Sequence, residues 1–439
     1  MNVRTRIAPS PTGRMHIGTV RTALFNYLYA KKHDGTYIVR IEDTDKERSK
    51  AVHEAEIWSD FEWLGLGPDE KYRQSEHAPR HRDLLHELVS KDRAYVSNEQ
   101  AKDGSGREVS VVRLRNPGRK VTFHDIVRGD ITFDTTELGD FVIARSIDDP
   151  LYHFAVVADD GDEKISHVIR GEDHISNTPR QILIQEALEL PRPVYAHLPL
   201  ILAPDRSKLS KRKHNASIEV YREAGFLPEA ILNFLALLGW NPGTEQEIFS
   251  VAELIDAFTL ENIQKSGATF NTDKLRWFNK AHLARLAPEV FLATIRTRLE
   301  SQTPRPLTET EAARIIPILR DRIEVLSDVD ASVKEGEWQF AFSRPTMPHE
   351  KLTWKDTPTN LTKTHLTQAR TAFAEADFSP ESLKMALWGY AEEHGRGSVL
   401  WPVRFALTGM ERSPDPFTVA SILGKEETLA RLDAAIQAV

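Results

Sequence analysis

Two stretches of the sequence combine residue types that handle phosphate groups. The first, RIAPSPTGRMHIGT, places His16 and Gly18 where a turn leads into a predicted helix. Backbone amides at a helix start bind phosphate, although a histidine there is more often a cap or a surface residue. The second, RSKLSKRK at 206–213, is usually a solvated loop. In a nucleotide enzyme, however, Lys208 and Lys211 could neutralise charge on an α-phosphate and on leaving pyrophosphate.

Charged residues also mark the ends of three predicted strands. Arg6 lies at the end of the first, Glu42 and Asp43 at the end of TYIVRI, and Arg170 and Glu172 at the end of SHVIR. In open α/β sheets, ligands bind outside the carboxyl ends of the strands. The three strand ends are therefore expected to converge on one site.

The spacing of apolar residues predicts the strands and helices that position these side chains. A strand at Val3–Ala8, a helix at Val20–His33 and a strand at Thr36–Glu42 form a β–α–β unit with a parallel strand pair. From 91 to 149, short β-type runs separated by turns indicate a β-rich insertion. The chain is mainly helical from about 217 onward.

Composition excludes several classes of protein. The 439 residues suggest about three domains. The net charge of -8 argues against a wholly basic nucleic-acid-coating protein. The absence of cysteine excludes disulfides, thiol nucleophiles, iron–sulfur clusters and cysteine-based zinc sites. The apolar stretch Ala230–Trp240 is too short to span a membrane, and the N-terminus has no apolar signal core. A soluble cytoplasmic protein is expected.

A histidine cluster is the main rival candidate for a site. His77, His81 and His86 lie on one predicted helix, the first two one turn apart. The sequence offers no evident third ligand beside them, so this cluster is expected to be a solvated helix face.

The phosphate-handling motifs resemble those of a known family. RIAPSPTGRMHIGT resembles the His-Ile-Gly-His signature of class I aminoacyl-tRNA synthetases, with Thr19 in the fourth position as is usual for the glutamyl branch. KLSKR at Lys208–Arg212 resembles their Lys-Met-Ser-Lys-Ser signature. RIEDTDKERS, DPLYHFAVVADD, VIRGEDHISNTPRQ and LNFLALLGWNPG are similar to glutamyl-tRNA synthetases, and the resemblance covers essentially the whole chain.

The resemblance implies an α/β protein with several domains. A Rossmann catalytic domain carries a β-rich inserted acceptor-stem-binding domain, and an α-helical connecting region and an all-α anticodon-binding domain follow. The implied boundaries are 1–90 and 151–216 for the two halves of the catalytic domain, 91–150 for the insertion, 217–290 for the connecting region and 291–439 for the anticodon domain.

The resemblance also implies a reaction and its residues. ATP activates L-glutamate to glutamyl-adenylate, and the glutamyl group passes to the 3'-terminal ribose of tRNA-Glu, with His16, Lys208 and Lys211 as the catalytic residues. The implied ATP-binding residues are His16, Gly18, Thr19, Glu172, His174, Leu209, Ser210 and Lys211. Those for glutamate are Arg6, Ala8, Ser10, Glu42, Tyr152 and Arg170, with Arg48 as a weaker candidate, and those for tRNA are Arg113, Arg115, Arg119 and Lys120.

Two positions depart from the family pattern. Val156 stands where some members have a pocket asparagine, and Ser97–Ser110 reads as a short polar loop without the cysteines that hold zinc in some members. The resemblance implies ATP with Mg²⁺, and the missing cysteines imply no zinc, with no metal held by the protein itself. The expected partners are L-glutamate and tRNA-Glu, for a monomer that does not bind membranes.

Alternatives to this activity remain open. A variant could also charge tRNA-Gln, or the chain could be a non-catalytic tRNA-binding paralogue, against which the intact signatures argue. A glutaminyl enzyme is less favoured because the C-terminal half reads as helical rather than as β-barrels. The roughly 150 residues after Leu286 argue against a shortened relative that lacks the anticodon domain.

Overall fold

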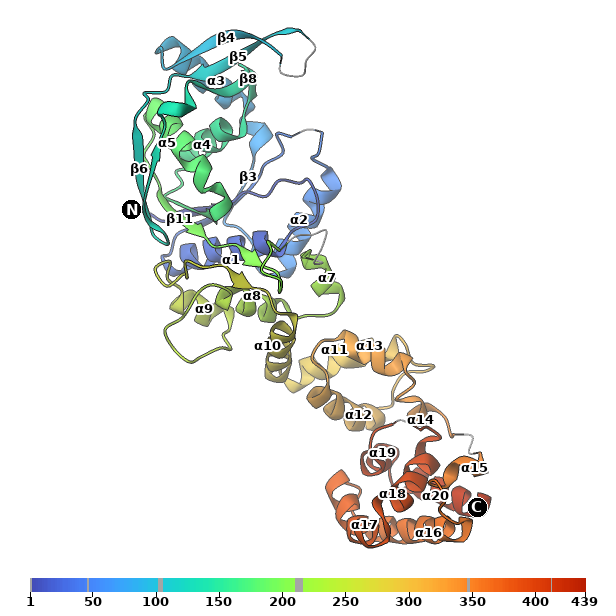
Figure 1. Ribbon diagram of the computed structural model, residues 1–439. Helices are drawn as coiled ribbons and strands as arrows, with labels where there is room; N and C mark the ends of the chain where they lie inside the picture. Colours follow the sequence, from blue (N-terminus) through green and yellow to red (C-terminus); the bar gives the residue numbers. More distant parts are fainter. Residues whose placement is uncertain (1, 46, 102–105, 210–215, 346–347, 412) are drawn as a thin grey trace. The chain divides into compact units, whose positions relative to one another are not determined.

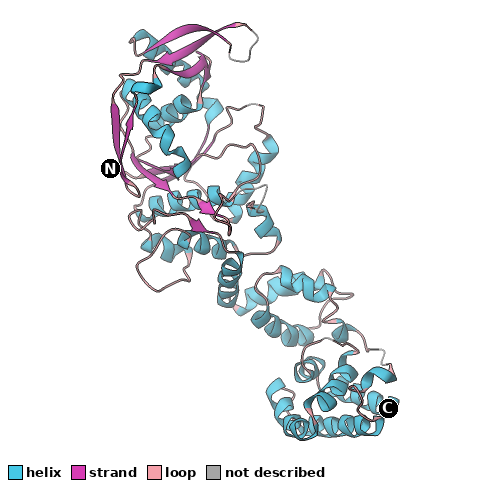
Figure 2. Cartoon of the chain, viewed as in Figure 1, coloured by secondary structure: helices cyan, strands magenta, loops and turns pink. Residues whose placement is uncertain are grey.

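The chain divides into two compact units, Met1–His282 and Leu283–Val439, which we describe separately. The structure is a computed structural model (Figure 1), and it describes residues 2–45, 47–101, 106–209, 216–345, 348–411 and 413–439. Figure 2 shows the strands of the described residues in the first unit and helices throughout the second.

The first unit begins with the predicted β–α–β unit. Three parallel strands lie in the order β1-β2-β3, and Arg6 of β1 pairs with Ile38 of β2. The crossover helices bury one face each, with Leu24 and Leu28 of the first fully buried. The elements are β1 (Arg4–Ile7), α1 (Ile17–Lys32), β2 (Thr36–Ile41), α2 (Ala51–Trp63) and β3 (Glu70–Arg73).

A second sheet lies beside the first, in the order β10-β11-β6-β7. The Ser166 backbone N–H donates to the Arg4 carbonyl at 3.0 Å, which joins the start of β10 to β1. β10 and β11 are parallel, whereas β6 and β7 form an antiparallel hairpin attached to β11. The elements are β6 (Lys120–Asp125), β7 (Gly129–Asp134), α4 (Tyr152–Asp162), β10 (His167–Gly171), α5 (Thr178–Ala187) and β11 (Val194–Leu198).

The predicted insertion is β-rich, and it contains a further antiparallel sheet, β4-β5-β8-β9. The expectation of a polar loop at Ser97–Ser110 is wrong for its described ends, because β4 and β5 pair across it and Asn98 lies opposite Ser110. Only residues 102–105 of that stretch lie outside the described residues. The elements are α3 (Ala78–Ser90), β4 (Ala94–Gln100), β5 (Glu108–Leu114), β8 (Phe141–Ser146) and β9 (Asp149–Pro150).

The insertion shares its core with the α/β part of the unit. Val112, Leu114 and Ile143 of the insertion are buried in one apolar cluster with Phe154 of α4 and Leu85 of α3. Burying such side chains contributes about 1.5–3 kcal/mol each. The insertion is therefore packed onto the α4 side of the unit rather than joined to it by chain connections alone.

Helices complete the first unit, and α1 packs against α8 and α9. The apolar stretch at Ala230–Trp240 forms most of α8, with Ile231 and Leu235 fully buried. Among the described residues, no helix is long and apolar enough to cross a membrane. The elements are β12 (Ile201–Leu202), α7 (Ile218–Glu223), α8 (Pro228–Leu237), α9 (Val251–Ala257), β13 (Ala268–Thr269) and α10 (Thr272–Arg285), the last running three residues past the unit boundary.

The second unit is all-α in its described residues, which confirms the expected fold class. Trp338 and Phe340 are buried, as are Leu366 and Phe373. Its helices are α11 (Pro288–Glu300), α12 (Glu309–Arg322), α13 (Ser327–Lys334), α14 (Gln339–Phe342), α15 (His349–Leu352), α16 (Thr359–Glu375), α17 (Pro380–His394), α18 (Arg396–Thr408), α19 (Pro416–Leu423) and α20 (Lys425–Ala438).

Candidate active site

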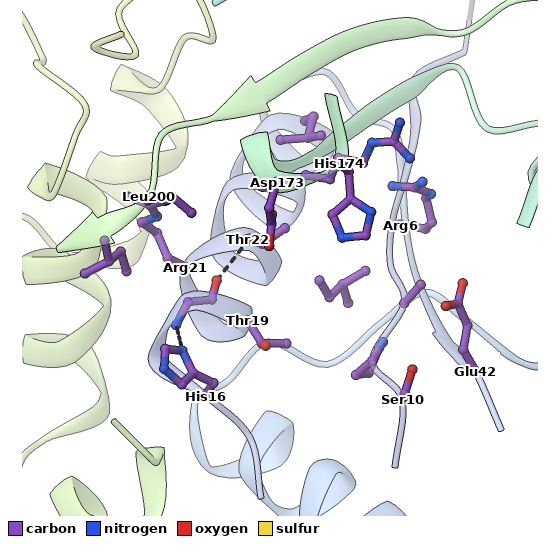
Figure 3. Close-up of a pocket in the computed structure, with 18 of the residues that line it drawn as sticks. Arg6, Ser10, His16, Thr19, Arg21, Thr22, Glu42, Asp173, His174 and Leu200 are labelled. Carbon is purple, nitrogen blue, oxygen red and sulfur yellow. Dashed lines mark hydrogen bonds between the residues drawn. The ribbon is translucent and has the colours of Figure 1, made fainter. Parts of the chain in front are cut away.

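A pocket of about 640 Å³ lies where the three charged strand ends meet. Arg6 of β1, Glu42 just after β2 and Arg170 of β10 all line it. In Figure 3, Arg6, Ser10 and Glu42 lie on one side, and His16 and Thr19 lie across from them at the start of α1. The carboxyl ends of parallel strands thus place these charges around one hollow, as the strand-end rule predicts.

The α1 end of the pocket has the chemistry of a phosphate site. His16 is the N-cap of α1, and its Nδ1 accepts from the Gly18 backbone N–H at 2.9 Å. In a neutral imidazole the proton is then on Nε2, which makes that nitrogen a donor. The helix start contributes partial positive charge. A Cβ at position 18 would lie 3.1 Å from the His16 Nδ1, so glycine suits this close approach.

The opposite end holds two buried arginines. The Arg6 Nε and Nη2 atoms each lie 3.1 Å from an oxygen of Asp160. The Arg170 Nε donates to the His197 Nε2 at 3.1 Å, and its Nη2 donates to the Thr178 hydroxyl at 2.9 Å. Two guanidinium groups beside one cavity suit an anionic substrate, and their planar shape suits a carboxylate.

A buried charge network supports Arg6 and Glu42 from below. Arg40 is fully buried, and its Nη1 donates to Asp160 at 2.9 Å and to Glu163 at 2.7 Å. Its Nη2 lies 3.3 Å from Glu42. Burial raises the pKa of Glu42, while Arg40 and Arg6 oppose that rise. Arg40 therefore helps to keep a carboxylate at the pocket wall, where it can hold an ammonium group.

The pocket is also lined by Tyr152, His174 and Lys208. The Tyr152 hydroxyl lies 3.3 Å from the His174 Nδ1. Burial and, after it, the nearby Arg170 lower the pKa of His174 to about 4, so this imidazole is neutral at pH 7. The Lys208 Nζ lies 3.0 Å from Asp173. Both side chains are exposed, and an exposed ion pair contributes little to stability, so Lys208 can exchange Asp173 for another anionic partner.

The pocket thus collects most of the residues expected for ATP and glutamate. Glu172 is absent from its lining and instead pairs with Arg128 and accepts from the Leu200 backbone N–H at 2.8 Å. Ser210 and Lys211 lie outside the described residues. The expected residues that line the pocket are Arg6, Ala8, Ser10, His16, Gly18, Thr19, Glu42, Tyr152, Arg170, His174, Lys208 and Leu209.

The remaining candidates lie elsewhere in the first unit. Arg48 lines a separate hollow of about 850 Å³, which shares Ser10, Glu42 and Tyr152 with the pocket. The tRNA candidates lie on the insertion, where Lys120 is exposed and three arginines are paired: Arg113 with Glu99 at 2.5 Å, Arg115 with Asp92 at 2.8 Å and Arg119 with Glu186 at 2.5 Å.

Sequence reasoning missed the residues behind the pocket wall. These supporting residues are Arg40, Asp160, Thr178 and His197. The first three lie within RIEDTDKERS, DPLYHFAVVADD and VIRGEDHISNTPRQ, but no role is predicted for them there, and ADD at 158–160 places two acidic residues after an apolar run. Two acidic residues at the end of a buried helix are a signal for a buried ion pair. His197 ends a strand beside β10, and the strand-end rule could have found it.

The expectation of a solvated histidine cluster is wrong for His81. His86 is exposed, but His81 is only 1% exposed, and its Nε2 lies 2.6 Å from Asp159. The His77 Nδ1 lies 3.0 Å from the same Asp159 oxygen. Among the described residues, these three form the one cluster with the spacing of a metal site. Arg40, 3.8 Å from Asp159, adds a positive charge that opposes a cation there.

Comparison with known proteins gives the class to which this fold and pocket belong. The catalytic domain of class I tRNA synthetases (E and Q) matches residues 2–103 and 97–277. An anticodon binding domain matches residues 277–436. The chain is therefore a member of the class I tRNA synthetases of the E and Q group.

Its relatives narrow this to one family. The chain is 36% identical to a glutamate–tRNA ligase of Desulforamulus reducens, with 100% of each chain covered. It is 38% identical to one of Nitrosospira multiformis, with 99% of each covered. A crystal structure of a glutamate tRNA ligase from Elizabethkingia meningosepticum, in complex with its amino acid, matches with a TM-score of 0.87 and 31% identity over 100% of this chain and 99% of that one. The chain belongs to the glutamate–tRNA ligase family.

Proposed function

We propose that this protein activates L-glutamate with ATP and transfers the glutamyl group to the 3'-terminal ribose of tRNA-Glu. The observation that carries the proposal is the single pocket that joins a phosphate-type helix start, with His16 and Gly18, to the arginine pair Arg6 and Arg170. Family membership over the full chain supports the same activity.

The chemistry requires no protein nucleophile. The glutamate α-carboxylate itself attacks the α-phosphate of ATP and pyrophosphate leaves; the ribose hydroxyl of the tRNA then attacks the carbonyl of the adenylate and AMP leaves. The protein must hold the two substrates in line and stabilise the charge that develops. His16, the Gly18 and Thr19 amides and Lys208 are placed to contact ATP, which enters as its magnesium complex. Lys211, expected for the same step, lies outside the described residues.

The amino acid is oriented by its three charged groups. Arg6 and Arg170 contact the side-chain carboxylate, and Glu42 contacts the ammonium group, with Ala8, Ser10 and Tyr152 completing the wall. The α-carboxylate is then directed toward the α1 end of the pocket. Glu172 acts on ATP only indirectly, because it fixes the Leu200 backbone at the pocket rim.

Transfer requires tRNA, and the anticodon binding domain at 277–436 supports a tRNA partner. In the first unit, the exposed Lys120 supplies positive charge on the insertion, which suits contact with acceptor-stem phosphates. Arg115 and Arg119 can join it if they exchange their exposed carboxylate partners for phosphates. We propose tRNA-Glu as the substrate and the cytoplasm, where protein synthesis uses charged tRNA, as the place of action.

The first test is glutamate-dependent ATP–pyrophosphate exchange with glutamate, ATP, magnesium and total tRNA. An absence of exchange under these conditions would remove the enzymatic function. Arg170→Ala is expected to damage the use of glutamate far more than that of ATP, whereas Arg180→Ala, which removes an arginine outside the pocket lining, serves as the matched control. Equal KM and rate for glutamate in the wild type and R170A would exclude Arg170 from the pocket.

A second test concerns the tRNA. Purified tRNA-Glu and tRNA-Gln transcripts are charged side by side, and charging of tRNA-Glu alone is expected. Comparable charging of both would identify a non-discriminating enzyme. Lys211→Ala is expected to lower the activation rate far more than it weakens tRNA binding, and equal effects on both would indicate an RNA contact instead.

A further inference from the structure

Arg170 is held along one edge of its guanidinium group by two polar partners. The Nε atom donates to the His197 Nε2 at 3.1 Å, and Nη2 donates to the Thr178 hydroxyl at 2.9 Å. Both partners are fully buried, and Arg170 itself is 7% exposed. The Nε edge thus faces the protein, and the opposite edge, Nη1 with the outer hydrogen of Nη2, is the one that can hold a carboxylate with paired bonds.

Behind His197 lies a buried carboxylate whose orientation is fixed by four donors. The Asp125 Oδ2 accepts from the His197 backbone N–H at 3.0 Å and lies 2.7 Å from the His197 Nδ1. Its Oδ1 accepts from the backbone N–H groups of Val127 at 3.0 Å and Arg128 at 2.9 Å. Asp125 and His197 are both fully buried.

These contacts determine the tautomer of His197 from both sides. The Arg170 Nε–H can only donate, so the His197 Nε2 must accept. The Asp125 Oδ2 accepts from the neighbouring backbone amide, so the Nδ1 must donate to it. His197 is therefore a neutral imidazole with its proton on Nδ1. Burial lowers the pKa of His197 against the opposing bond from Asp125, in agreement with a neutral ring.

We propose that Asp125 and His197 are positioning residues that set the direction of Arg170 and, through it, the preference for a substrate with a side-chain carboxylate. The inference rests on the proposed function, in which Arg170 contacts glutamate. Asp125 belongs to β6, so the predicted insertion supplies part of the amino-acid site. Residues that support a metal ligand in the same indirect way change affinity or activity by about 10–100-fold when replaced, and we expect an effect of that order here.

Replacing Asp125 by asparagine reverses the proton arrangement. If the amide oxygen keeps the Val127 and Arg128 amides, the NH₂ group faces both the Nδ1 and the backbone N–H of His197. It can only donate to Nδ1, and the backbone N–H of His197 loses its acceptor. The proton of His197 then moves to Nε2, where it opposes the Arg170 Nε–H. In the other amide orientation, the NH₂ group faces the backbone N–H groups of Val127 and Arg128. Two backbone donors then lose their acceptor, so this orientation is less favourable. Asp125→Asn is therefore expected to misdirect Arg170 with little change in volume.

Two amide substitutions at position 197 distinguish a positioning role of His197 from a purely structural one. In His197→Gln the amide oxygen can occupy the Nε2 position and accept from Arg170, whereas His197→Asn reaches only the Nδ1 position. Both remove a buried imidazole, so a purely structural role predicts similar losses. The positioning role predicts that H197N lowers kcat/KM for glutamate by about 10–100-fold, with H197Q closer to the wild type.

The kinetic test is ATP–pyrophosphate exchange with tRNA present, comparing glutamate with glutamine for the wild type, D125N, H197N and H197Q. D125N and H197N are expected to lower the glutamate-to-glutamine ratio of kcat/KM, while the KM for ATP stays within about twofold, because the ATP contacts lie at the other end of the pocket. His282→Gln, which removes a buried histidine of the first unit outside the pocket lining, is the control for loss of stability alone.

A spectroscopic test is independent of activity. In protein labelled with ¹⁵N-histidine, with H197Q assigning the signal, His197 is expected to show a protonated Nδ1 and an unprotonated Nε2, and D125N is expected to exchange them. An Nε2-protonated ring in the wild type would overturn the inference. So would equal selectivity in H197N and the wild type. If the wild type itself activates no glutamate, the proposed function fails, and the tautomer still decides whether Arg170 is held as described.

Discussion

Arg40 makes the strongest prediction about stability, because it is fully buried among carboxylates. Its Nη1 lies 2.9 Å from Asp160 and 2.7 Å from Glu163, and its Nη2 lies 3.3 Å from Glu42. Arg40→Met keeps most of the side-chain volume and removes the charge. Asp160, Glu163 and Glu42 then lose the cation that lies closest to them.

The expected cost follows from these contacts. Removing one partner of a buried ion pair costs about 3–5 kcal/mol. Here the lost partner serves four carboxylates, because Arg40 also lies 3.8 Å from Asp159. In a domain of this size, each 1 kcal/mol lowers the melting temperature by about 2–4 °C. A decrease of about 10 °C in the unfolding of the first unit is therefore expected.

The difference in stability between the wild type and R40M should depend on pH in a definite direction. Burial already raises the pKa of Glu42 while Arg40 opposes it, so losing Arg40 raises that pKa further. A carboxyl whose pKa is raised by folding is least destabilising below its unfolded pKa and most destabilising once pH passes its folded pKa. The stability gap between the wild type and R40M is therefore expected to narrow as pH falls from 7 toward 5.

Urea unfolding followed by circular dichroism at pH 5, 6, 7 and 8 measures this gap. Arg80→Met, which removes an exposed ion pair with Asp162, is the matched control and is expected to cost less than about 1 kcal/mol. If R40M unfolds within about 1 kcal/mol of the wild type at pH 7, or if the difference in stability widens as pH falls, Arg40 does not stabilise the buried carboxylates as described.

Four smaller predictions concern single contacts. A Cβ at Gly35 would lie 2.3 Å from the Val3 carbonyl oxygen, so Gly35→Ala should lower stability in urea by about 1–3 kcal/mol. Bonds from Arg4 and Tyr72 lower the pKa of Glu70 from 4.5 to about 2, so the wild-type advantage over Glu70→Gln, about 1 kcal/mol for this half-exposed pair, should be present at pH 6 and decline as pH falls from 4.5 toward 2. Asp415 accepts from two backbone amides as the N-cap of α19, so Asp415→Ala should cost about 1 kcal/mol in thermal unfolding. His16→Asn can retain the cap without the Nε2 group, so activation should fall about 100-fold at an unchanged melting temperature, and an unchanged rate would separate His16 from the phosphates.

The pocket could be predicted from sequence because its parts obey local rules. Arg6, Glu42 and Arg170 each stand at the end of a recognisable strand, and parallel strands carry their ends to one edge. The helix after the first strand follows from its apolar spacing, and His16 stands at its start. No knowledge of long-range contacts is needed for these steps beyond the β–α–β handedness rule.

The supporting residues depend on contacts between distant segments, which composition does not reveal. Asp125 meets His197 because β6 attaches to β11, a pairing that spans about 70 residues and has no local signal. His81 is buried because α4 presents Asp159 to it, although the helix around His81 reads as polar. VSVVRLR predicts most of β5, but the sequence does not predict β4, because its polar residues alternate with half-buried positions on an exposed sheet.

The two pocket arginines use the same geometry with different charge balance. In both, the Nε and Nη2 edge faces the protein and leaves the other edge for the pocket. Arg6 is held by Asp160, a carboxylate that offsets its charge. Arg170 is held by a hydroxyl and, as the tautomer argument requires, a neutral imidazole, so nothing in that anchoring edge offsets its charge. A carboxylate beside a guanidinium group reduces the net attraction of that group for a substrate carboxylate. Under the proposed function, Arg170 therefore supplies most of the attraction for a substrate carboxylate, and Arg6 mainly fixes its orientation.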